Sequence, residues 1–105
     1  MTRLTDTQIE KLEAKGFNRW TKGSYDRLYI NPESFGLKVE RYGTGNVAYA
    51  EFEGERISNS EGTRMLNGKY FIDIESGKLF MKTDAHRPSK IKEAIERIMT
   101  EVIDA

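Results

Sequence analysis

Three short turn signals, each flanked by alternating apolar and polar residues, constrain the fold of this chain more than any other feature. They lie at residues 23–24, 43–46 and 75–78. Glycine in the first central position suits a two-residue type II′ turn, and four-residue loops are also common in hairpins. A slip of one residue would turn each flanking apolar set to solvent. The sequence therefore predicts three antiparallel hairpins with defined registers.

Counting outward from each turn gives the expected strand pairs. The first hairpin pairs Lys22 with Tyr25, Trp20 with Arg27 and Asn18 with Tyr29. The second hairpin pairs Leu37 with Phe52, Lys38 with Glu51 and Val39 with Ala50. The third hairpin pairs Ile74 with Leu79 and Ile72 with Met81. Each hairpin then has one apolar face, as burial against a core requires.

Helices are predicted near both ends of the chain and before the third hairpin. Thr5 and Gln8 have the spacing of a capping box, and Gly16 is placed to end that first helix. Residues 58–68 predict a short helix of about two turns. Pro88 suits the first position of the last helix. The apolar face of that helix recurs every three or four positions, at Ile91, Ala94, Ile95, Ile98, Met99 and Val102.

The expected fold is α+β in a single domain, residues 1–105. We expect a mostly antiparallel sheet of three hairpins, with the N- and C-terminal helices packed on one face and the short helix before the third hairpin. A small curled barrel is the alternative. A chain of 105 residues buries only about two-thirds of the surface that its unfolded form exposes. One layer of helices on one sheet can provide a core of that size.

Composition bears on several function classes. Lysine plus arginine and aspartate plus glutamate number 17 each, so the formal net charge is zero. Strong non-specific nucleic-acid binders are usually basic overall, although a local basic stripe is compatible with zero net charge. The chain has no cysteine, which excludes thiol catalysis, disulfides and cysteine zinc sites. No signal-peptide pattern and no long apolar run is present, so we expect a soluble cytoplasmic protein with no membrane contact.

The clearest candidate site is residues 19–29, where aromatic and basic side chains interleave around the first turn. The predicted register places five of them on one face, namely Trp20, Lys22, Tyr25, Arg27 and Tyr29. Trp20 opposite Arg27 predicts a cation–π pair. Three interpretations are open. The rings stack on unpaired bases while the cations bind phosphates, they form a protein hot spot, or residues 58–68 cover them as a second small core.

Further rings are expected on the same outer side of the sheet, and these are Tyr42, Tyr49, Phe71 and Phe80. A large exposed apolar patch usually marks a partner surface, whereas a covering segment would make these rings structural. We include Tyr42 with the first hairpin as a candidate binding residue.

Candidate catalytic residues are few and lack obvious partners. His86 is the single histidine, and catalysis would require a nucleophile or an orienting group beside it. Two pairs of carboxylates lie two positions apart on predicted strands, Asp73 with Glu75 and Glu51 with Glu53. Solvated sheet charges are the simpler interpretation of both pairs. We expect no cofactor, no metal and no enzymatic activity, and an enzyme built on His86 and a carboxylate is the third hypothesis.

Three segments read RWTKGSYDRLYIN (residues 19–31), RISNSEGTRML (residues 56–66) and KYFIDIESGKL (residues 69–79). Together they resemble a small uncharacterised domain of phages and mobile elements of Gram-positive bacteria. The resemblance implies a stand-alone protein that binds or inhibits a host factor, with anti-CRISPR proteins as one class. It brings no catalytic residues.

These patterns predict a non-enzymatic binding module that contacts a host protein or ribonucleoprotein through the outer face of the first hairpin. The alternative is direct binding of single-stranded nucleic acid, with rings of that face on bases and its cations on phosphates. Nucleic-acid affinity should fall steeply as salt rises. Solvent exposure of the rings favours a binding site, and burial beneath residues 58–68 favours a core.

Overall fold

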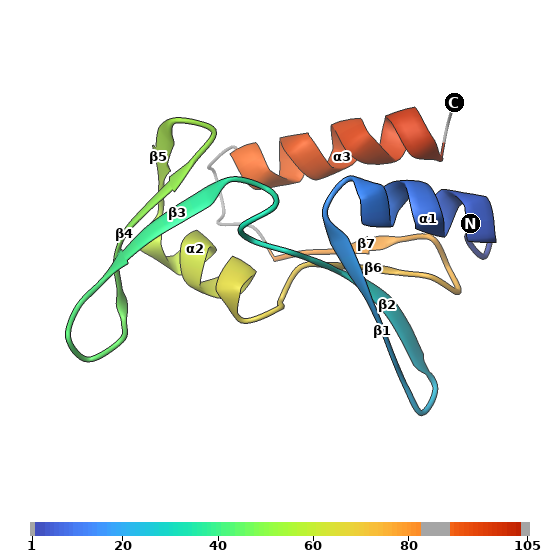
Figure 1. The fold of residues 1–105 in the computed structure, drawn as a ribbon, viewed down its shortest axis with the longest axis horizontal. Coiled ribbons are helices and arrows are strands. Elements are labelled where there is room, and N and C mark those ends of the chain that lie inside the picture. The colour runs from blue at the N-terminus through green and yellow to red at the C-terminus, as the bar shows by residue number, and fades with distance from the viewer. Residues whose placement is uncertain (1, 83–88, 104–105) are drawn as a thin grey trace.

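The computed structural model describes residues 2–82 and 89–103, and Figure 1 shows how its elements are arranged. In chain order these elements are α1 (Asp6–Ala14), β1 (Phe17–Lys22), β2 (Tyr25–Ile30), β3 (Leu37–Arg41), β4 (Val47–Phe52), β5 (Glu55–Ile57), α2 (Asn59–Leu66), β6 (Phe71–Asp73), β7 (Leu79–Phe80) and α3 (Lys90–Val102). Every strand pair is antiparallel. The predicted α+β class is confirmed.

The three hairpins divide between two antiparallel sheets, where the sequence analysis expected one. The four-stranded sheet has the order β1-β2-β6-β7, and the three-stranded sheet has the order β3-β4-β5. Pro32 separates them, because proline cannot donate to a strand ladder and the turns over residues 32–36 redirect the chain. The ring of Phe35 packs edge-on against that of Phe17, with centroids 5.2 Å apart, and this contact anchors the corner to the core.

The predicted registers of the first two hairpins are confirmed. Trp20 opposes Arg27 in β1 and β2, and Lys38 opposes Glu51 in β3 and β4. Both turns are short, and a short loop largely determines which residues face each other. In the second hairpin the register shifts between Glu40 and Arg41, so Arg41 opposes Val47 next to the turn.

The predicted register of the third hairpin is wrong by two residues, because Ile72 opposes Leu79 and not Met81. The Asp73 side chain accepts hydrogen bonds from the backbone N–H of Ser76 at 3.0 Å and from its hydroxyl at 2.7 Å. The Asp73 backbone N–H also donates to the Lys78 carbonyl at 2.9 Å, so this Asx-type turn moves the four-residue loop from residues 75–78 to residues 74–77. A shift of two preserves the faces, so Ile72 is still buried.

The strand β5 was not predicted from the sequence. This strand follows β4 through a two-residue turn in which Glu53 (φ 52°) and Gly54 (φ 80°) both have positive φ. A turn of that kind matches the twist of the flanking strands and usually contains Asn-Gly or Asp-Gly. Glu-Gly is a weaker form of the same signal.

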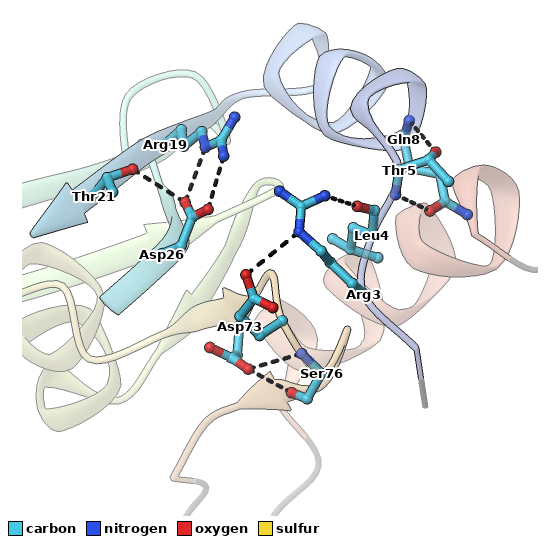
Figure 2. A network of polar contacts seen from close by, with 10 residues as sticks. Arg3, Leu4, Thr5, Gln8, Arg19, Thr21, Asp26, Asp73 and Ser76 are labelled. Atoms are coloured by element: carbon cyan, nitrogen blue, oxygen red, sulfur yellow. Dashed lines mark hydrogen bonds and ion pairs between the residues drawn. The ribbon is translucent and has the colours of Figure 1, made fainter. Parts of the chain in front are cut away.

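Helices cover one face of the four-stranded sheet. Phe17, Leu28 and Ile72 are buried on that face, and α1 packs against β1 and β2, with Ile9 and Leu12 as its buried residues. The capping box predicted at the start of α1 is present (Figure 2).

The third helix, α3, connects the two sheets. It lies alongside α1 and extends to β5, as Figure 1 shows. An ion pair lies at each end of α3. At its start the Lys90 amine is 3.4 Å from the Glu55 carboxylate. Near its end the Glu101 carboxylate is 3.4 Å from the Lys15 amine. Its N-cap is Ser89, so its first helical residue is Lys90 and not the predicted Pro88, which lies outside the described residues.

Candidate functional site

The predicted site lies on the outer face of the four-stranded sheet, the face turned away from α1. Side chains alternate along β2, which places Tyr25, Arg27 and Tyr29 on this face. The register adds Lys22 opposite Tyr25 and Trp20 opposite Arg27. The structure therefore brings together all five residues that the first hairpin contributes to the predicted site.

Four rings cross this face from β1 to β7 as a continuous aromatic row, made of Trp20, Tyr29, Phe71 and Phe80. Trp20 meets Tyr29 edge to face with centroids 6.1 Å apart, and Tyr29 lies 5.4 Å from Phe71. Phe71 and Phe80 stack at 5.3 Å with 13° between their planes. Such distances are typical of interacting rings, about 4.5–7 Å, so each ring restrains the next.

The Arg27 guanidinium lies between two rings. Its central carbon is 4.1 Å from the ring centroids of both Tyr25 and Phe71, and its Nη1 donates to the Tyr29 hydroxyl at 3.1 Å. The predicted cation–π pair with Trp20 is therefore replaced by a sandwich, because β6 places Phe71 on the far side of Arg27. The buried Nε has no hydrogen-bond partner.

The outer face is open to solvent over much of its area. Exposed fractions are 43% for Trp20, 52% for Tyr25 and 47% for Phe80, while Tyr29 and Phe71 are half-buried. Residues 58–68, the covering segment of the structural alternative, therefore leave these three rings exposed. Gly68, just beyond α2, comes close enough that an added Cβ would lie 3.5 Å from the Tyr29 ring.

The end of α2 forms a wall beside the aromatic row. A first hollow of about 510 Å³ lies there, lined by Trp20, Arg27, Tyr29 and Phe71 on the sheet side and by residues 67–69 on the other. The left-handed conformation of Gly68 (φ 67°) turns the chain at this wall. The hollow is wide enough to hold a ring-sized group against the row.

Charges on the outer face are mostly positive. Lys22 and Lys69 are exposed at its rim, and Arg27 lies at its centre. Asp73 lies opposite Arg27 in β6, but its carboxylate accepts the two hydrogen bonds from Ser76. The face therefore offers cations around exposed rings, although the whole chain has no net charge.

Two other predicted outer rings lie in the other sheet. Tyr42 follows β3 and is 61% exposed. Figure 1 shows the β3–β4 and β1–β2 turns at opposite ends of the molecule, so the structure does not bring Tyr42 to the aromatic row. The hydroxyl of half-buried Tyr49 donates to the Glu51 carboxylate at 3.4 Å. The two sheets separate rings that a single sheet would have joined.

The carboxylates considered for catalysis have separate structural partners. Glu75 lies 3.4 Å from Nε of Arg3, and Glu53 lies 3.9 Å from a guanidinium nitrogen of Arg97. His86 lies outside the described residues. Within residues 2–82 and 89–103, no three His, Cys, Asp or Glu side chains are grouped so as to hold a metal ion.

Comparison of the chain with protein-family models, with curated proteins and with solved structures gave no match. None of the helices described is long and apolar enough to cross a membrane. The residues of the outer face are thus the basis on which function can be argued.

Proposed function

We propose that this protein is a non-enzymatic binding module that contacts a macromolecular partner through the outer face of its four-stranded sheet. The observation that carries the proposal is the aromatic row. Its two end rings, Trp20 and Phe80, are close to half exposed. Large exposed apolar surface on a small domain usually marks a contact surface.

The rigidity of the face supports a binding role. Trp, Tyr and Arg side chains dominate interface hot spots, and here they restrain one another before a partner arrives. Tyr25 and Phe71 sandwich Arg27, while Tyr29 accepts its hydrogen bond. A face ordered in advance loses little conformational entropy on binding.

The expected partner is a host protein or ribonucleoprotein in the cytoplasm. The resemblance of three segments to domains of phages and mobile elements supports this context, which would make the protein an accessory or inhibitor protein, with anti-CRISPR proteins as one class. Nothing in the proposal requires a cofactor, a metal or membrane contact.

Affinity capture from a Gram-positive bacterial lysate tests the proposal. We expect the wild-type protein to retain a specific protein or ribonucleoprotein that the double variant Trp20→Ala/Arg27→Ala does not retain. Lys11→Ala/Lys38→Ala is the control, since it removes two exposed cations from outside the outer face. Circular dichroism checks that each variant is folded. Equal retention by the wild type and by the Trp20→Ala/Arg27→Ala variant would overturn the proposal.

A further inference from the structure

A second hollow borders the first one at the end of α2. This second hollow, of about 520 Å³, lies between α2 and the β3–β4 turn, and its lining includes Arg41, Asn46, Thr63, Arg64 and Asn67. Asn67 also lines the first hollow. The two hollows thus share one lining residue at the end of α2, and we refer to the surface along both of them as the path.

Among the residues that the structure describes, no aspartate or glutamate lines either hollow. The cations along the path are Arg27 and Lys69 in the first hollow and Arg41 and Arg64 in the second. Arg64 is oriented by its Nε, which donates to the Tyr70 hydroxyl at 3.1 Å. Arg41 is exposed, and its Nη1 donates to the Gly45 carbonyl at 2.8 Å. A path lined with cations and without acids complements an anion.

We propose that the partner of this surface is a single strand of nucleic acid, free or displayed on a ribonucleoprotein. The proposal rests on the proposed function and names the chemistry that the outer face recognises. Bases stack in the first hollow against the aromatic row, and the backbone passes Asn67 so that the exposed Arg41 meets its phosphates.

The arrangement of rings and cations favours a nucleic acid over an acidic polypeptide. Stacking on exposed sheet aromatics, with cations at the rim, is how many proteins hold unpaired bases. Arg27 is fixed between two rings, so the exposed Lys22, Lys69 and Arg41 are the cations left to meet phosphates. An acidic peptide would match the charge and leave the aromatic row without a planar partner.

The single tryptophan of the chain makes the proposal directly measurable. The probes are labelled oligouridines of about 12 and about 4 nucleotides, lengths that bracket small single-strand sites. We expect the longer probe to quench Trp20 fluorescence and to raise probe anisotropy. We assume about three phosphate contacts, each of which adds about −0.7 to the slope of log affinity against log salt concentration. Affinity should then fall about 20-fold between about 50 and 200 mM salt.

Variants distinguish the contribution of each hollow to probe affinity. Trp20→Ala should weaken both probes about tenfold or more, since one stacked base contributes that much. Arg41→Ala should weaken the longer probe about fivefold at about 0.1 M salt, with the salt slope reduced by about 0.7, and leave the shorter probe unchanged. Lys11→Ala removes an equal charge from α1 and should change neither affinity. Both substituted site residues are exposed, so the fold should be retained.

Two results would overturn the inference. One is the absence of oligouridine binding in low salt. The other is binding of a polyglutamate peptide of equal charge as tightly as the longer oligouridine. If capture from the lysate still depends on Trp20 and Arg27 in either case, the binding module stands with a protein partner. Nuclease treatment of the captured material identifies the source of the strand, because components held through RNA are then released.

Discussion

Arg27 shows how residues far apart in the sequence hold one side chain in place. Its guanidinium stacks between Tyr25, two positions away, and Phe71, which β6 supplies. The sequence predicted the face on which Arg27 lies, because strand alternation is local. It did not predict the sandwich, since the pairing of β2 with β6 depends on the whole fold. A planar guanidinium can stack on both rings, whereas an ammonium is a point charge.

We therefore expect Arg27→Lys to destabilise the protein by about 1 kcal/mol although the charge is retained. Urea unfolding at neutral pH measures the change. Lys69→Arg is the control, because it exchanges the same two residue types at an exposed position of the same surface. Wild-type stability for Arg27→Lys would show that the stacking is not a source of stability.

Asp26 is the second residue whose contacts should change the stability of the protein measurably. Arg19 donates to both of its carboxylate oxygens, at 2.9 and 2.8 Å, and the Thr21 hydroxyl donates at 3.2 Å (Figure 2). Hydrogen bonds from Arg19 are the main reason that the pKa of Asp26 lies below its ordinary value, and they outweigh the opposing effect of burial. The folded state therefore binds the Asp26 proton more weakly than the unfolded state does.

A lowered pKa of Asp26 stabilises the fold above about pH 5, and the stabilisation is lost as the pH falls through the folded-state pKa. We expect Asp26→Asn to reduce the free energy of unfolding by about 1 kcal/mol at pH 7, because the pair is partly exposed to solvent. The difference in free energy of unfolding between the variant and the wild type should become smaller as the pH approaches 3. Urea titrations at several pH values measure it, and a gap independent of pH would contradict the assignment.

At the scale of elements, α2 depends on a close approach to β4. A Cβ added to Gly62 would lie 2.7 Å from the Cβ of Ala50, which is fully buried. On propensity alone, a glycine at position 62 disfavours a helix. The structure gives a packing reason for it, because the helix backbone lies almost directly on the strand.

Gly62→Ala should consequently destabilise the protein by about 1–3 kcal/mol, as overpacking does, even though alanine is the better helix former. Thermal or urea unfolding measures the effect. The control is Gly43→Ala in the β3–β4 loop, where an added Cβ meets no atom within 4 Å. If Gly62→Ala raised stability, α2 would have room to move away from β4.

Element boundaries and short-range registers were largely predictable, since caps and turns depend on a few neighbouring residues. The first two hairpins and the capping box at Thr5 followed from such local chemistry. The division into two sheets did not, because Pro32 shows where a strand ends without showing where the next one goes. The same limit applies to the site. Strand alternation predicted its first-hairpin half and the outward side of Phe71 and Phe80. The pairing of β2 with β6 and the contribution from the end of α2 were not predictable.

At the scale of the whole molecule, buried polar contacts between helices connect the two sheets. The Ser89 hydroxyl donates to the Glu61 carboxylate and also accepts the Lys92 backbone N–H at 3.1 Å, which caps α3. Both Ser89 and Glu61 are buried. Since α2 packs on β4 and α3 packs beside α1, this contact couples the three-stranded sheet to the helical side of the four-stranded sheet. Such a link predicts that the two sheets unfold together.

Ser89→Ala should therefore destabilise the protein by about 2–3 kcal/mol, because it removes the cap of α3 and leaves a buried carboxylate without its partner. Thr5→Ala is the matched control and removes only an exposed N-cap of α1, with an expected loss of about 1 kcal/mol. Hydrogen exchange in Ser89→Ala should show amide protection falling by the same factor in β2 and in β4. Loss confined to β4 would mean that the sheets are independent units, because only a cooperative fold spreads a defect at one helix start over both.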